Sequence, residues 1–210
     1  MTATPIARPP RAVLFDLDGV LADSFEAWVA VLDGCRARRG LPPLGPAPVR
    51  ASWGQGIAAD VRTFFPGEAV ARLAREYDEG FLEHIGRVRP IDGAPETVGA
   101  IAAAGLPVAV VTNSPVALTK RVLAQLGLRD LVGTIAGGDE VPRGKPDPAL
   151  VLLALERLGL GPGEAVFVGD TELDVAAGRA ARIPVIGYRI QGDERVDRMP
   201  DLLPLLGLQG

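Results

Sequence analysis

A short apolar strand that runs directly into two aspartates constrains this chain more than any other stretch. The apolar residues 13–15 are followed by Asp16, Leu17, Asp18 and Gly19. A short apolar run of this kind is typical of a strand buried in a sheet, and an unpaired charge inside such a strand would be costly. We therefore expect both aspartates at or beyond the carboxyl end of the strand, which is where open α/β sheets bind ligands.

The spacing of the two aspartates adds a second constraint. Asp16 and Asp18 are two positions apart, so in an extended backbone their side chains point to the same side. Two carboxylates directed at one place repel each other, and a cation beside them would relieve that repulsion. Gly19 would let the backbone turn with a positive φ or approach a ligand closely, so it is a candidate substrate-binding residue. The alternative interpretation is an aspartate-rich turn without function, because such turns often follow strands.

Beyond residue 90, stretches typical of strands alternate with stretches typical of helices. The expected strands are residues 107–112, 134–137, 165–169 and 184–188, and the helices between them begin near residues 94, 115, 147 and 171. Strands that alternate with helices predict a parallel sheet covered on both faces. The fold class is therefore α/β, with a Rossmann-like parallel sheet and helices on both of its faces.

The stretch directly after the first strand has a different character. Residues 24–87 contain no strong strand, and apolar residues recur there at helical spacing. Helices are expected at residues 24–40, 56–65 and 68–86, and the proline-rich residues 41–48 are expected to form a loop. The prediction is a small helical cap domain at 24–87, inserted into an α/β core domain made of 12–23 and 88–210.

Composition excludes several classes of partner. The formal net charge of the 210 residues is −4, and without a basic cluster neither nucleic acid nor an anionic membrane is an expected partner. No apolar run approaches the roughly 18 residues of a membrane span, and residues 1–11, a proline-rich tail, contain no signal-peptide pattern. Cytoplasmic localisation is therefore the expectation, and either a monomer or a homodimer is compatible with the sequence.

Polar residues follow two more of the predicted strands. Thr112 and Asn113 end one strand, and Asp170 and Asp174 follow another, while Lys145 stands just before a predicted helix. Because the carboxyl ends of parallel strands share one edge of a sheet, these side chains can converge with Asp16 and Asp18.

These residue types together suit chemistry on a phosphate group. Asp16 and Asp170 are hard oxygen ligands of the kind that Mg²⁺ prefers, and Thr112 with a helix start can form a phosphate cradle. Lys145 adds a positive point charge. An aspartate can attack phosphorus and form an aspartyl-phosphate, and a second carboxyl group can protonate the leaving oxygen. Asp16 and Asp18 suit these two roles.

The same segments resemble the four motifs of the haloacid dehalogenase superfamily. The similar stretches are residues 16–20, residues 112–114, Lys145 with Pro146, and Gly169-Asp170 followed by Asp174. The helical insert resembles the cap of the phosphoglycolate-phosphatase and β-phosphoglucomutase branch. The resemblance extends from the first strand to about residue 188.

The resemblance implies a role for each matching residue. Asp16 would be the nucleophile and a Mg²⁺ ligand, and Asp18 the general acid and base that also ligates the metal through its backbone carbonyl. Asp170 would be the third protein ligand, and Asp174 would order the metal shell. The catalytic lysine would be Lys145, and Thr112 with the amide of Asn113 would bind phosphate.

Several of these positions have a second interpretation. Residues 171–174 also match a capping box, so Asp174 could serve the helix start. Ser114 is interpreted as a helix N-cap. In the cap, Trp53 and Gln55 lie in a loop with two glycines and could face the substrate, or Trp53 could only pack the cap. Arg50 is a further candidate for a substrate contact.

The predicted function is a Mg²⁺-dependent phosphatase that acts on a small phosphorylated metabolite, such as phosphoglycolate or a sugar phosphate. The dehalogenases of this superfamily resemble its phosphatases but lack an aspartate at the position of Asp18. Its phosphonate-cleaving members need a lysine in the cap, and residues 24–105 contain none. A β-phosphoglucomutase-like phosphotransferase is the alternative. A catalytically idle phosphate-binding protein is a further one, although every catalytic position is filled.

Overall fold

The computed structural model describes residues 9–208, so most of the predicted N-terminal tail lies outside the described residues. Its centre is a six-stranded sheet in the order β5-β4-β1-β6-β7-β8, in which every neighbouring pair is parallel. The strands are β1 (Ala12–Phe15), β4 (Val108–Thr112), β5 (Thr134–Gly137), β6 (Ala165–Gly169), β7 (Val185–Tyr188) and β8 (Glu194–Val196). The predicted α/β fold class is confirmed.

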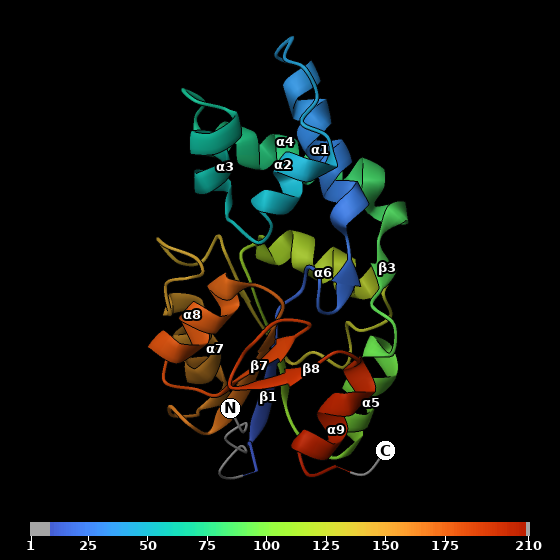
Figure 1. Ribbon diagram of the computed structural model, residues 1–210, viewed down its shortest axis with the longest axis vertical. Coiled ribbons are helices and arrows are strands. Elements are labelled where there is room, and N and C mark those ends of the chain that lie inside the picture. The colour runs from blue at the N-terminus through green and yellow to red at the C-terminus, as the bar shows by residue number, and fades with distance from the viewer. Residues whose placement is uncertain (1–8, 209–210) are drawn as a thin grey trace.

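Helices cover both faces of this sheet (Figure 1). One face packs against α5 (Ala94–Ala103), α6 (Val116–Gln125) and α9 (Leu202–Leu205), and the other against α7 (Ala149–Leu158) and α8 (Glu172–Ala180). Successive side chains of a strand point to opposite faces. Accordingly Val13 and Phe15 belong to the first apolar core, whereas Leu14 belongs to the second. This double burial explains why the strands are continuous apolar runs.

The order of the strands places the candidate residues together. The chain continues from β1 to β4 and β5 on one side, and later returns to β6, β7 and β8 on the other side. The carboxyl end of β1 therefore lies between those of β4 and β6, at the switch point where α/β sheets bind ligands.

Four helices lie beyond that end of the sheet, in the upper part of Figure 1. They are α1 (Phe25–Ala37), α2 (Pro46–Ala51), α3 (Ile57–Phe64) and α4 (Val70–His84), which is followed by the 3₁₀ turn η1 (Ile85–Arg87). The chain reaches them through β2 (Ala22–Asp23) and leaves them through β3 (Arg89–Pro90), and these two strands pair antiparallel. The division into a core and a cap domain at these residues stays a prediction.

Two local predictions were wrong. Residues 41–48 were expected to be a loop, but Pro46 begins α2, because proline is well tolerated in the first turn of a helix. Ser114 was interpreted as an N-cap, but Pro115 holds that position of α6 and the Ser114 hydroxyl donates elsewhere. Within residues 9–208 no helix combines the length and apolar character that a membrane span would need.

The close packing of α8 against β7 depends on a glycine, Gly178. A Cβ atom on Gly178 would overlap the side chain of Val185 in β7, whereas a Cβ on Gly99 in α5 would meet open space. We expect Gly178→Ala to lower the free energy of unfolding by about 1–3 kcal/mol through overpacking. The matched Gly99→Ala should raise it by up to about 1 kcal/mol through helix propensity. Denaturant unfolding of both variants measures the difference, and equal effects would contradict the packing argument.

Candidate active site

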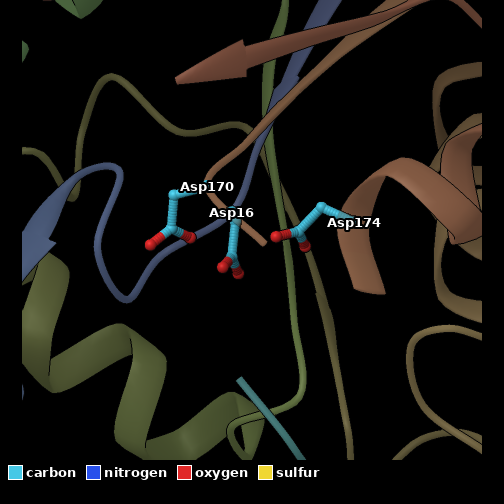
Figure 2. A group of neighbouring side chains, drawn as sticks. All are labelled: Asp16, Asp170 and Asp174. Atoms are coloured by element: carbon cyan, nitrogen blue, oxygen red, sulfur yellow. The ribbon is translucent and has the colours of Figure 1, made fainter. Parts of the chain in front are cut away.

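Three carboxylates gather at the carboxyl edge of the sheet. One oxygen from each of Asp16, Asp170 and Asp174 lies within 4.8 Å of the others. Figure 2 shows Asp16 between the other two side chains, with Asp16 following β1, Asp170 following β6, and Asp174 at the start of α8. Sequence reasoning placed all three at this edge, and the fold brings them together.

The ammonium group of Lys145 ties this cluster together. Its Nζ lies 2.6 Å from Asp16 Oδ1 and 2.6 Å from Asp174 Oδ1, and it donates to the carbonyl of Val111 at 3.2 Å. An ammonium has three N–H donors, so all three have acceptors. Lys145 is only 5% exposed and Asp16 only 3%. The lysine is therefore a fixed buried charge, not a mobile surface side chain.

Burial controls the protonation of the carboxylates. It raises the pKa of Asp16 well above the usual range, although the Lys145 ammonium opposes that rise. Burial, together with the nearby Asp174 carboxylate, raises the pKa of Asp170 to about 7. Three carboxylates against one ammonium leave an excess of negative charge that a cation would offset.

Asp170 has the features of an oxygen ligand for a cation. Its Oδ1 is buried and has no hydrogen-bond partner among the described residues. Burying a carboxylate oxygen without a partner is costly, and a bound cation would remove that cost. Gly19 makes room for this carboxylate, because a Cβ there would overlap it and the glycine has a φ of +91°. Gly19 was predicted to bind substrate, but it is not among the residues that line the cavity. The carboxylate set fits a divalent cation with oxygen ligands.

Asp174 has two structural tasks at once. Its Oδ2 accepts hydrogen bonds from the backbone N–H of Thr171 at 3.0 Å and from its hydroxyl at 2.6 Å, which completes a capping box at the start of α8. Its Oδ1 accepts from Lys145. Both interpretations of this aspartate are therefore compatible with the structure, since the cap orients the same carboxylate that joins the acidic cluster.

The carboxylate of Asp18 accepts its hydrogen bonds from donors outside the cluster of three carboxylates. Its Oδ1 accepts hydrogen bonds from the hydroxyl of Ser24 and, at 3.3 Å, from the indole of Trp28. Its Oδ2 accepts from the hydroxyl of Ser114 at 3.0 Å. Sequence reasoning missed these donors because they lie 6, 10 and 96 residues from Asp18 and only the fold brings them to it. They hold the carboxyl group at the edge of the cavity.

A cavity of about 620 Å³, including its open mouth, lies between the sheet edge and helices α1–α4. From the core it is lined by Asp16, Asp18, Thr112, Asn113 and Lys145, among others. Thr112 is 1% exposed, and its hydroxyl accepts the backbone N–H of Ser114 at 3.1 Å. All predicted catalytic residues and the two predicted phosphate contacts thus share one cavity.

Asn113 connects the two sides of this cavity. Its side-chain amide donates to the carbonyl of Gly54 at 2.8 Å, in the loop between α2 and α3. The same side chain accepts the backbone N–H of Lys145 at 2.7 Å and donates to the carbonyl of Lys145 at 3.1 Å. The sequence suggested a role only for its backbone amide, because the loop that its side chain contacts lies 59 residues away.

The predicted cap residues line the opposite wall. Trp53 and Gln55 both face the cavity. The ring of Trp53 also packs edge-on against Phe25, with 5.2 Å between centroids, so it has a packing role as well. Arg50 stacks over the ring of Phe25 and is not among the residues that line the cavity. Sequence reasoning missed Asp60, a buried carboxylate in this wall.

Comparison with known proteins shows that the chain is similar to hydrolases that act on phosphate esters. The family model for haloacid dehalogenase-like hydrolases matches residues 10–182. The chain is 38% identical over 176 residues to the N-acetylmuramic acid 6-phosphate phosphatase of Pseudomonas aeruginosa, covering 81% of this chain and 78% of that protein. It is 34% identical over 204 residues to the phosphoglycolate phosphatase of Xanthomonas campestris, covering 93% and 92% of the two chains.

A solved structure supports the same fold. The crystal structure of a putative phosphoglycolate phosphatase from Lactobacillus plantarum superposes with a TM-score of 0.84, covering 94% of this chain and all of that one at 21% identity. The family model spans the segments that carry the acidic cluster, and the two relatives each match about four fifths or more of the chain. The chain therefore belongs to the haloacid dehalogenase-like hydrolases and is an enzyme of their phosphatase kind.

Proposed function

We propose that this chain is a Mg²⁺-dependent phosphatase that hydrolyses a small phosphorylated metabolite through an aspartyl-phosphate on Asp16. The observation that carries the proposal is the buried ion pair between Asp16 and Lys145, which lines the cavity and adjoins two more carboxylates. The two relatives are named for small phosphorylated substrates, which supports the same substrate size here.

Asp16 is the proposed nucleophile because one of its oxygens is fixed and the residue faces the cavity. Lys145 pairs with Oδ1, which leaves Oδ2 to attack phosphorus. A bond then forms between Oδ2 and phosphorus while the bond from phosphorus to the ester oxygen breaks. The ammonium of Lys145 offsets the negative charge that would otherwise keep a carboxylate and a phosphate apart.

Asp18 is the proposed general acid and base. Protonated, it gives its proton to the departing ester oxygen, and the resulting carboxylate then takes a proton from the water that hydrolyses the aspartyl-phosphate. The donors Ser24, Trp28 and Ser114 orient this carboxyl group. They fix its position relative to Asp16 through both stages of the reaction.

The remaining core residues would hold the phosphate and the cation. Thr112 and the backbone amide of Asn113 are the proposed phosphate contacts. The carboxylates of Asp16, Asp170 and Asp174 and the backbone carbonyl of Asp18 are the groups that would hold Mg²⁺, directly or through water. When bound, the cation would reduce the negative charge on the phosphate oxygens and on the cluster.

Helices α1–α4 are proposed to act as a cap that closes over the bound substrate. Their only chain connections are the paired strands β2 and β3, which can serve as two short hinges. The hydrogen bond from Asn113 to the carbonyl of Gly54 joins this cap to the core beside the cavity. Closure of this kind would exclude water and favour small substrates.

Asp16→Asn should abolish turnover without unfolding the chain. An amide cannot attack phosphorus, so we expect kcat to fall by about three orders of magnitude or more. Phosphate release from para-nitrophenyl phosphate measures the loss, and circular dichroism checks the fold. The matched control is Asp130→Asn, a change at an exposed residue that does not line the cavity. If Asp16→Asn kept more than about a tenth of the activity, Asp16 could not be the nucleophile.

Mg²⁺ should both activate and stabilise the protein. A cation bound only by the folded chain stabilises it by about 2.7 kcal/mol at 100 times its Kd, so the Tm should rise with MgCl₂ but not with NaCl of equal ionic strength. Asp170→Asn should reduce this Mg²⁺-induced shift, whatever it does to the Tm without metal. Excess chelator should abolish activity, and undiminished turnover in chelator would contradict the site.

The phosphotransferase alternative is tested by following products. Hexose 1-phosphate with a catalytic trace of the hexose 1,6-bisphosphate would be converted to hexose 6-phosphate by a mutase. A phosphatase would release inorganic phosphate instead. Phosphate release that matches substrate consumption supports the proposed function, and isomerisation without release would replace it by the phosphotransferase.

A further inference from the structure

The wall of the cavity formed by α1–α4 carries a negative charge, which is unusual in a pocket that would take an anionic substrate. Six of its lining residues are aromatic or aliphatic, namely Trp28, Leu32, Val49, Trp53, Ile57 and Tyr77. Among the described residues that line the cavity, helices α1–α4 and their loops contribute no lysine, arginine or histidine. The one carboxylate that they contribute is Asp60.

The carboxylate of Asp60 is held in a fixed position in this wall. It lies in α3, is 8% exposed, and accepts a hydrogen bond at each oxygen. Gln55 donates its side-chain amide to Oδ1 at 2.6 Å, and the hydroxyl of Tyr77 donates to Oδ2 at 2.9 Å. An ionised carboxylate has about four lone-pair sites, so two donors leave acceptor capacity that a ligand can use.

Within residues 9–208, Asp60 forms no ion pair with a lysine, arginine or histidine. Both of its recorded partners are neutral donors, and Arg50 stacks on Phe25 and does not line the cavity. Burial raises the pKa of Asp60 to about 6, and the hydrogen bonds from Gln55 and Tyr77 limit that rise. At pH 7.5 the group is therefore mostly ionised and places a negative charge in the wall.

We infer that the leaving group of the substrate is an uncharged polyol, as in a sugar phosphate, and that Asp60 selects it by accepting a hydrogen bond from a hydroxyl. This inference rests on the proposed phosphatase function and names its substrate class. A hydroxyl donating to a buried carboxylate forms a charge-assisted bond, and the aromatic wall suits the apolar face of a carbon skeleton.

The same geometry disfavours a substrate that carries a carboxylate. Such a group would lie near Asp60 without a cation between them, and like charges in a closed site repel strongly. Two-carbon phosphoglycolate has a carboxylate as its entire organic end. Although relatives are named for that substrate, the negative charge of this cavity wall disfavours it here.

Matched pairs of phosphate esters test the inference. Sorbitol 6-phosphate and 6-phosphogluconate differ only in CH₂OH against COO⁻ at the far carbon, and 2-hydroxyethyl phosphate and phosphoglycolate differ in the same way. With Mg²⁺ present, we expect kcat/KM to favour the alcohol of each pair by about tenfold or more in the wild-type protein. A wild-type preference for the carboxylates would overturn the inference without any variant.

Asp60→Asn isolates the charge while keeping a side chain that Gln55 and Tyr77 can still contact. The alcohol-to-carboxylate ratio should fall by about fivefold or more, because the repulsion is removed. The matched control Glu79→Gln removes a charge from an exposed position of α4 outside the cavity lining and should leave the ratio unchanged. An unchanged ratio in Asp60→Asn would overturn the role of Asp60, and if that variant does not fold, the wild-type ratios still decide the substrate class.

Para-nitrophenyl phosphate separates this inference from the proposed function. If neither para-nitrophenyl phosphate nor any of the four matched esters released phosphate in the presence of Mg²⁺, the proposed phosphatase function would be wrong. Release from para-nitrophenyl phosphate together with a preference for the carboxylate esters would remove only the polyol inference.

Discussion

The structure of the site depends on one buried ammonium group. The three donors of Lys145 contact a carboxylate after β1, a carbonyl of β4 and a carboxylate of α8, so one side chain connects three elements that are distant in sequence. Without it, Asp16 and Asp174 would be buried like charges, which neither the sheet nor the helix could hold close together. The side chain of Asn113 holds the backbone N–H and carbonyl of the same residue, so Lys145 is fixed at its backbone as well as at its ammonium group.

Much of the fold was predictable because its signals are local. The buried parallel strands are continuous apolar runs, and turn residues separate them from the helices, so the α/β class and most elements follow from the sequence. The convergence of Asp16, Thr112 and Asp170 follows as well, since each stands at a strand end and the parallel sheet supplies the shared edge. Their catalytic roles stay predictions, although one cavity is lined by the proposed nucleophile, the lysine and the proposed phosphate contacts.

The features that escaped prediction depend on tertiary contacts. Ser114 precedes a proline at a helix start, which locally favours an N-cap, but its hydroxyl partner is Asp18, 96 residues away. Asp60 stands on the apolar stripe formed by Ile57, Val61 and Phe64, where a charged residue breaks the helical pattern. That break was the available signal, and a search for charges on apolar faces would have found it. Tyr77, which completes the Asp60 contact, is 17 residues away.

The pairing of β2 with β3 has a consequence for how such a protein can change. Ala22 pairs with Pro90 and Asp23 with Arg89, so the chain returns to the sheet at nearly the same point where it left. Because its two ends lie side by side, the segment between β2 and β3 can be lengthened, shortened or exchanged for another. The order of the core strands would stay the same. Under the proposed function, reaction and selectivity would thus be carried by separable parts of one chain, one of which can be rebuilt while the other keeps its geometry.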